Sequence, residues 1–371
     1  TLGGIITTFL LGFKLIPEYG LTLPAFFYGV FLLMLPALLL LFTCRKYSVG
    51  VAGMIVAALL TFSTFDFSKH VSNRFKVLYE SEGILGQIKV IDHTSEWYTE
   101  DVRMGRGLLV NNTLQTFMDV SNPENSSIWA WSSIIPTALS IYPRKTKVLL
   151  LGLGGGTIAK QLNRLGFDYD VVEIDRRIEE VAKTYFHLNV NQPILIDDAR
   201  HYIRTCKKKY DIVIFDTFLS ESAPEHLLTI ESFNDVQKVL NPKGMMLANF
   251  YGFLNGEKGK AARSVYKTLA KAGFIAKIIA TPGSEENRNL LFLGLTEEKD
   301  FTKVNYTESG SATFTDLTQF FVNQKQIDEN DALVLTDEKP QLGLLYAQAA
   351  MSWKKAYNSY YTKGFIEEKI N

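Results

Sequence analysis

Cysteine is scarce in this chain of 371 residues. The two cysteines, Cys44 and Cys206, lie in segments of different character, and two thiols are too few for a disulfide framework or a zinc site. His93, His201 and His226 share no ligand spacing with the cysteines or with one another, so we expect no metal centre. The sequence also lacks the nucleophile elbow of a Ser-His-Asp hydrolase.

An excess of charge of either sign is also missing. Lys and Arg together number 39, and Asp and Glu together number 39. Nothing in this balance indicates a nucleic acid or a strongly acidic partner, so we expect no nucleic-acid binding. The length suffices for about two domains with sizeable cores.

Residues 1–66 contain almost no charge and have the composition of a membrane segment. The clearest apolar run spans Leu21 to Cys44, which is long enough to cross a hydrocarbon core of about 30 Å. Shorter runs at Thr1–Ile16 and Ser48–Phe65 flank it, and a buried core helix is the alternative for these two. We therefore predict about three transmembrane helices. The chain begins with Thr, so we expect a fragment of a longer protein.

From Tyr79 onward, apolar and polar residues alternate. Residues 86–92 and 106–115 are predicted to form strands of a small antiparallel sheet with turns between them, within a domain at 77–120. Residues 126–139 are predicted to form a connecting helix.

Residues 121–300 show strands and helices in alternation. This pattern is typical of a parallel sheet covered on both faces. Residues 301–371 form a charged C-terminal extension, with a helix expected from Leu342. The strands are expected near 148–152, 170–175, 194–198, 210–216 and 244–250, with a final antiparallel pair at 275–281 and 289–295.

The turn after the first of these strands carries the clearest chemical signal. Gly152, Gly154 and Gly156 lie in Gly-Leu-Gly-Gly-Gly-Thr, and the next strand closes on Glu173. Such glycines let a ligand approach the backbone, the following helix directs amide groups toward it, and the acid can accept from ribose hydroxyls. The spacing departs from Gly-x-Gly-x-x-Gly, which favours the adenosine of an S-adenosylmethionine-type donor over NAD. An ordinary turn of a doubly wound sheet is the alternative.

We therefore predict an α/β protein with a Rossmann-like class I S-adenosylmethionine-transferase fold, preceded by the small antiparallel β domain and the transmembrane helices. Such a donor is found in the cytoplasm, which decides an ambiguity in orientation. Basic residues are enriched in cytoplasmic loops. Those at 45 and 46 precede the last span and a larger cluster at 69–76 follows it, so the two groups predict opposite orientations for that span. We favour the larger cluster, which places the catalytic domain in the cytoplasm.

Acidic residues follow the carboxyl ends of the predicted strands, where open α/β sheets bind ligands. Asp198 is a candidate acceptor for an adenine amino group, or a helix cap. Asp216 ends an apolar strand and is a candidate general base with a pKa raised by burial. Its alternatives are orientation of the donor and capping of the next segment. Asp175 is expected to be a partner of a helix N-terminus, and Asp197 to face solvent or to cap the helix.

The region from about 79 to 283 resembles the polyamine aminopropyltransferases, the spermidine synthase family. Gln87 matches a strand glutamine near the donor, and Leu108–Gln115 resembles the family's Leu-x-Leu-Asp-Gly-x-x-Gln hairpin. Pro224–Phe233 is similar to the segment Pro-Ala-Glu-His-Leu-Phe-Thr that closes the active-site loop.

The resemblance implies roles for particular residues. Glu173 falls on the ribose position, Asp198 and Ala199 on the adenine position, and Asp216 on the catalytic base. Thr217, Leu219 and Pro224 fall in the substrate loop.

The resemblance also extends to the two ends of the chain. The membrane segment and Leu335–Pro340 look like the bacterial branch in which such a domain is fused to membrane spans. This implies a multi-pass protein of the cell inner membrane. We also expect a homodimer.

The amine-binding half departs from the family pattern. The aspartate that holds the aminopropyl amine is replaced by Gly155, and a second amine-binding aspartate by Leu219. In the family, a helix contributes Tyr, His and Glu contacts to this half of the site; the corresponding positions here are about Ile128, Trp129 and Ala130. Because each ammonium group of a polyamine needs a carboxylate or a π face when it leaves water, these losses argue against putrescine in the usual pose.

Three hypotheses follow. The first is aminopropyl transfer from decarboxylated S-adenosylmethionine to a small-molecule amine, with Asp216 as general base; we favour it. The second is methyl transfer from S-adenosylmethionine to a small-molecule or membrane-accessible acceptor. The third is a non-catalytic nucleoside-binding domain that regulates the membrane part.

Overall fold

The computed structural model describes residues 2–20, 22–42, 50–56, 58–60, 75–93, 104–123, 130–190, 192–217, 224–307 and 313–352. The chain divides into two compact units. One contains the described residues up to 92 together with 109–112, and the other contains the remaining described residues.

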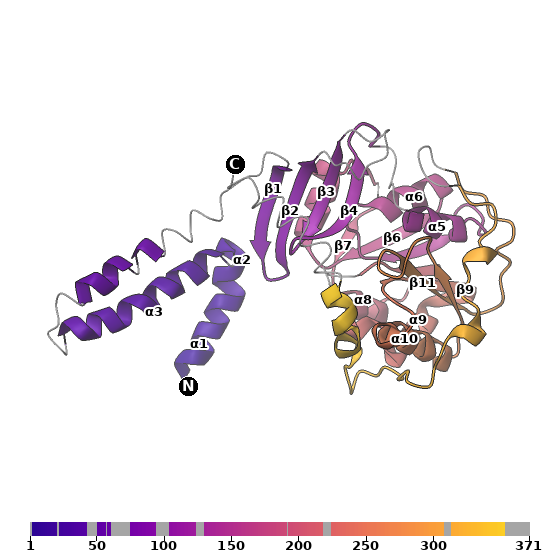
Figure 1. Ribbon diagram of the computed structural model, residues 1–371. Coiled ribbons are helices and arrows are strands. Elements are labelled where there is room, and N and C mark those ends of the chain that lie inside the picture. Colours follow the sequence, from indigo (N-terminus) through magenta and orange to yellow (C-terminus); the bar gives the residue numbers. More distant parts are fainter. Residues whose placement is uncertain are drawn as a thin grey trace. The chain divides into compact units, whose positions relative to one another are not determined.

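The N-terminal part is helical throughout its described residues (Figure 1). It forms α1 (Leu2–Leu10), the π-helical turn η1 (Leu11–Leu15), α2 (Ile16–Tyr19) and α3 (Thr22–Phe42), and residues 50–56 and 58–60 are also helical. Within these described ranges, no helix is both long enough and apolar enough to cross a membrane. The three transmembrane spans therefore stay a prediction.

A four-stranded sheet follows, with its strands in chain order. The strands are β1 (Phe75–Gly83), β2 (Gly86–His93), β3 (Gly105–Val110) and β4 (Thr113–Asp119). The predicted strand segment at 106–115 is divided by a two-residue turn, where Asn111 and Asn112 have φ of 51° and 62°. Asparagine tolerates this left-handed region, and two such residues in a row suit a hairpin turn. The small antiparallel sheet is thus confirmed.

The second sheet has seven strands in the order β10-β11-β9-β8-β5-β6-β7. Strands β5 to β9 pair in parallel where they are neighbours, while β9, β11 and β10 pair antiparallel. Every predicted strand is present, although β7 is shorter and β9 longer than expected. Their bounds are β5 (Lys147–Leu151), β6 (Asp168–Glu173), β7 (Ile194–Ile196), β8 (Tyr210–Phe215), β9 (Leu240–Tyr251), β10 (Ile275–Ala280) and β11 (Asn289–Leu295).

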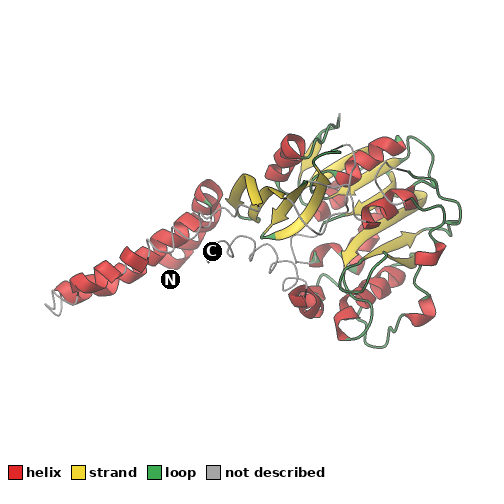
Figure 2. Ribbon diagram, turned by 45° about the horizontal axis from the view of Figure 1, so that its top comes forward, coloured by secondary structure: helices red, strands yellow, loops and turns green. Residues whose placement is uncertain are grey.

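Helices lie on both sides of the seven strands (Figure 2), as a Rossmann-like fold requires. They are α5 (Ala130–Leu139), α6 (Thr157–Leu165), α7 (Arg176–Tyr185), α8 (Ala199–Thr205), α9 (Ile230–Val239) and α10 (Lys260–Lys271), with short 3₁₀ turns η2 (Glu225–Leu227), η3 (Glu257–Gly259), η4 (Thr318–Phe320) and η5 (Gln324–Gln326). Residues 342–352 are helical, as expected from the sequence.

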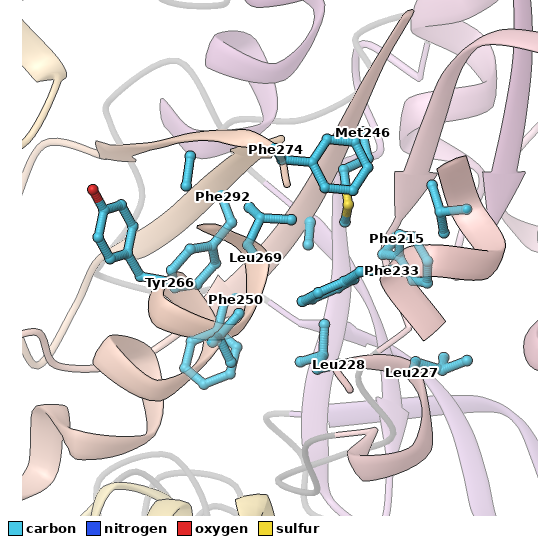
Figure 3. Packing of buried hydrophobic residues seen from close by; sticks show 14 of the residues in the cluster. Phe215, Leu227, Leu228, Phe233, Met246, Phe250, Tyr266, Leu269, Phe274 and Phe292 are labelled. Atoms are coloured by element: carbon cyan, nitrogen blue, oxygen red, sulfur yellow. The ribbon is translucent and has the colours of Figure 1, made fainter. Parts of the chain in front are cut away.

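The main core lies between the sheet and α8, α9 and α10. Figure 3 shows part of it, with Phe215 of β8, Phe233 of α9 and Met246 of β9. Leu342 and Tyr346 belong to the same cluster, and the Tyr346 hydroxyl donates to the carbonyl of Tyr251 at 2.7 Å. The C-terminal segment therefore packs into this core. The domain boundaries at 66, 77, 120 and 300 stay predictions.

Candidate functional site

The candidate site lies at the carboxyl ends of four adjacent parallel strands. The register pairs Leu151 of β5 with Phe215 of β8 and with Val172 of β6, and pairs Glu173 with Ile196 of β7. Because β6 and β8 lie on opposite sides of β5, this edge is the topological switch point at which such sheets bind ligands. Asp216, Gly152, Glu173 and Asp198 thus follow one another along the edge, with about 4.8 Å between neighbouring strands.

The glycine turn is pressed against Asp216. Gly152 has a φ of +89°, and a Cβ atom at this position would lie 2.1 Å from the carbonyl oxygen of Asp216 and 3.4 Å from the Cα of Thr217. The Asp216 N–H donates to the carbonyl of Leu151 at 2.8 Å. A side chain at 152 would therefore push the predicted base out of place, which explains why glycine is required there.

Glu173 supports the same turn from β6. One carboxylate oxygen accepts from the N–H of Leu153 and the other from the N–H of Asp175, both at 2.9 Å. The side chain is buried, and burial raises the pKa of Glu173 to about 7, although the two backbone donors act in the opposite direction. Each oxygen retains a further lone pair for a ribose hydroxyl. The ribose contact itself stays a prediction.

Asp198 is the N-cap of α8, and Ala199 is the first residue of that helix. The Asp198 carboxylate accepts from the N–H of His201 at 2.9 Å and lies 3.1 Å from Nε2 of His226. Burial acts to raise the pKa of Asp198, but these contacts outweigh it and lower the pKa. Asp197 lies 2.8 Å from Nδ1 of His201.

The other expected cap is confirmed, because Asp175 is the N-cap of α7 and accepts from the N–H of Arg177 at 3.0 Å. Asp175 therefore stabilises the start of α7.

The carboxyl group of Asp216 is held by Asn249, which is oriented in turn by Asn289; sequence reasoning missed both asparagines. Asn249 of β9 donates to Asp216 Oδ1 at 2.9 Å, and Asn289 of β11 donates to Asn249 Oδ1 at 2.9 Å. Asp216 keeps some exposure as a residue, but burial of its carboxyl group raises the pKa, while the Asn249 hydrogen bond lowers it. The signal for Asn249 was a polar residue inside the apolar run 245–251.

Thr116 of β4 is a third residue that was missed. Its hydroxyl oxygen accepts from the N–H of Gly155 at 2.8 Å. A Cβ atom at 155 would lie 2.5 Å from Thr116 Cγ2 and 3.1 Å from a ring carbon of Phe186. No carboxylate can therefore be placed at 155 unless these neighbours move.

Two predicted substrate-loop residues are described. Thr217 follows Asp216 directly, and Pro224 precedes η2, its carbonyl accepting from the N–H of Leu227 at 3.0 Å. Leu219 lies outside the described residues, as do Ile128 and Trp129; Ala130 begins α5.

Gln87 belongs to the other compact unit. There its side-chain amide donates to Glu80 at 2.9 Å and to Glu82 at 3.2 Å. The contact of Gln87 with a donor stays a prediction. Within the described ranges, no group of three His, Cys, Asp or Glu side chains is placed to hold a metal ion.

Comparison with known proteins bears on this site. Residues 131–302 match the family model described as the spermine/spermidine synthase domain. A polyamine aminopropyltransferase of Vibrio vulnificus is 26% identical over 183 residues, which are 47% of this chain and 59% of that protein. One from Thermoplasma volcanium is 32% identical over 123 residues, 31% of this chain and 45% of that protein.

A relative with a different name matches as well. The N-terminal histidine N-methyltransferase of Emericella nidulans is 31% identical over 141 residues, 37% of this chain and 24% of that protein. The chain spans 59% and 41% of the lengths of the first two curated relatives. These matches confirm the resemblance inferred from the sequence, but not its membrane-fused branch.

Proposed function

We propose that this protein transfers an aminopropyl group from decarboxylated S-adenosylmethionine to a small-molecule amine, with Asp216 as general base, because residues 131–302 match the spermine/spermidine synthase domain. The observation that carries the proposal is the position of Asp216. Its backbone packs against the glycine turn at Gly152, while its carboxyl group is oriented by Asn249 and has a raised pKa.

The same edge of the sheet would hold the donor nucleoside. Glu173 would accept from the ribose hydroxyls, and Asp198 and Ala199 would lie at the adenine. Gly152, Gly154 and Gly156 all have positive φ, so the backbone can pass close to the ligand without a side chain in between.

The donor supplies a carbon made electrophilic by its sulfonium. The acceptor nitrogen forms a bond to the methylene carbon, the carbon–sulfur bond breaks, and the electron pair leaves on sulfur as neutral methylthioadenosine. Asp216 takes the proton that the nitrogen loses. Because the leaving group needs no acid, positioning and the exclusion of water supply most of the rate.

Identification of the nucleoside product by mass spectrometry tests the proposal. The protein is incubated with decarboxylated S-adenosylmethionine and a set of amines, and methylthioadenosine is the expected product. Asp216→Asn should lower turnover on the order of 10²–10⁴-fold yet still bind methylthioadenosine. Asp211→Asn is the matched control, since this carboxylate lies near the start of the same strand, β8, and also accepts from an asparagine, Asn241, at 2.8 Å. Full activity in Asp216→Asn would remove it as the base.

A second candidate function is methyl transfer from S-adenosylmethionine, favoured by the filled space at Gly155. Thr116 and Phe186 occupy the position where the resemblance places an amine-binding aspartate. Without that aspartate, the ammonium group of the decarboxylated donor loses a partner, and the carboxylate of ordinary S-adenosylmethionine meets no repulsion. The same assay with S-adenosylmethionine would then yield S-adenosylhomocysteine. Tight nucleoside binding with neither product would favour the non-catalytic hypothesis.

We also propose that residues 1–66 attach the protein to the cell inner membrane as a multi-pass segment, with the catalytic domain on the cytoplasmic side. The support is the row of exposed large apolar side chains on α1 and α3, which includes Leu2, Phe9, Phe27 and Phe31. Recovery of the full chain in the membrane fraction after carbonate washing is expected; release by the wash would contradict the proposal. A homodimer remains a prediction.

A further inference from the structure

The segment Leu335–Pro340 has no part in the chemistry described so far, yet it contacts the end of the substrate loop. Leu335 is buried, and its carbonyl accepts from the N–H of Ile230 at 3.0 Å. The Asp337 carboxylate accepts from the hydroxyl of Thr229 at 2.6 Å. The N–H of Asp337 donates to Glu231 at 3.0 Å. A C-terminal segment therefore holds the start of α9.

Arg200 connects Asp337 to η2. Its guanidinium group donates to Asp337 at 3.1 Å and to the backbone carbonyl of His226 at 2.9 Å. Arg200 is only 8% exposed, although it carries a full charge. Such a buried cation needs fixed partners, so Asp337 and Asp235 (3.2 Å away) determine where it can donate.

The first residue of η2, Glu225, contacts Gly343, which follows the segment Leu335–Pro340 along the chain. The N–H of Gly343 donates to the carboxylate of Glu225 at 2.6 Å. A Cβ atom at 343 would lie 2.2 Å from that carboxylate oxygen, so the glycine permits the close approach. Residues 337–343 therefore hold η2 at its first residue and, through Arg200, at its second.

The side chain of the second of these residues, His226, points to the nucleoside side of the site. His226 Nε2 lies 3.1 Å from Asp198 Oδ2, and Asp198 is the predicted adenine acceptor. Any shift of η2 would change this contact, and with it the orientation of the Asp198 carboxylate. The other oxygen of Asp198, Oδ1, accepts a hydrogen bond from the N–H of His201.

We propose that Asp337 is a positioning residue for the donor site: through Arg200 and Thr229 it holds η2 so that His226 stays in contact with Asp198, and it thereby sets the affinity for the donor's nucleoside. This inference rests on the proposed function, because it requires that an adenosine-type nucleoside binds beside Asp198. Asp337 itself touches neither the nucleoside nor the acceptor.

The test is the affinity of the full chain for methylthioadenosine, measured by titration calorimetry. Asp337→Ala should weaken binding about fivefold, which corresponds to about 1 kcal/mol, the typical net contribution of one hydrogen bond. Asp337→Asn should recover most of this loss, because the carboxamide oxygen still accepts a hydrogen bond. If the effect passes through His226, Asp337→Ala should weaken binding no further in a His226→Ala background.

Asp331→Ala is the matched control. Asp331 also pairs with a buried arginine at 2.6 Å, but that arginine, Arg263, belongs to α10 and donates to the carbonyls of Leu254 and Gly256. The Asp331→Ala variant should lower the unfolding temperature at least as much as Asp337→Ala does, but it should leave the affinity for methylthioadenosine unchanged.

Three results would contradict the inference. They are equal affinity in Asp337→Ala and the unmutated chain, equal weakening by Asp331→Ala, and full additivity with His226→Ala. Absence of any binding by the unmutated chain would instead overturn the proposed function and, with it, this inference.

Discussion

Glu173 offers a quantitative test of the electrostatics of the glycine turn. Its carboxyl group has an ordinary pKa of 4.5 and a pKa of about 7 in the folded protein, where burial outweighs the two backbone donors. The folded state therefore holds this proton more tightly than the unfolded state does. The resulting stability is fully present below pH 4.5 and is lost as the pH rises through 7.

The size of the effect follows from the shift. At about 1.36 kcal/mol per pKa unit, this one group should make the free energy of unfolding about 2.5 kcal/mol lower at pH 8 than at pH 5. Other groups also titrate over this range, so the comparison must be made against a variant. Glu173→Gln has no titrating group at this position, and its loss of stability between pH 5 and pH 8 should be smaller by that amount.

Urea unfolding followed by circular dichroism at pH 5, 6, 7 and 8 measures this difference. Glu173→Gln should also be less stable at every pH, because one backbone N–H would face the carboxamide NH₂ group, a loss of about 1–3 kcal/mol. Glu180→Gln, which removes an exposed glutamate from α7, should keep the pH dependence of the unmutated chain. The reasoning is refuted if Glu173→Gln and the unmutated chain show the same pH dependence.

Two further predictions concern the base and the turn. Because Asp216 must be ionised to act, activity should fall as the pH decreases. Asn249→Ala removes the hydrogen bond that lowers the pKa of Asp216, so the fall in activity should move to higher pH. An unmoved pH–rate profile would reject this role for Asn249. Gly155→Ala should lower the free energy of unfolding by about 1–3 kcal/mol through overpacking. Thr116→Ser, which removes the methyl group 2.5 Å from the new Cβ, should restore part of that loss in the double variant; a double variant no more stable than Gly155→Ala would contradict it.

The positions of the strands and the acids at their ends could be predicted from the sequence because both depend on local patterns. Apolar strands followed by Gly152, Glu173 and Asp216 bring those residues to one edge in any parallel sheet of this order. Asn249 and Asn289 could not be assigned, since their contact depends on the register between β9 and β11.

Contacts between segments far apart in the sequence could not be predicted either, because they also depend on the tertiary arrangement. Thr116 reaches Gly155 across 39 residues of chain, and Gly343 reaches Glu225 across 118. Neither pairing leaves a periodic signal. The apolar composition of residues 1–66 predicted helices, which the described residues of this segment do form, but composition does not determine what their exposed faces contact.

The hydrogen bonds of the glycine turn also restrict which adenine compounds can bind. The N–H of Leu153 is taken by Glu173, that of Gly155 by Thr116 and that of Gly156 by the carbonyl of Leu153. A phosphate group needs such amides as donors, and it would also lie near the Glu173 carboxylate. Because these three amides already have acceptors, a phosphate group over the turn would lack them as donors, and we expect the turn to favour adenosine compounds without phosphate over ATP and NAD.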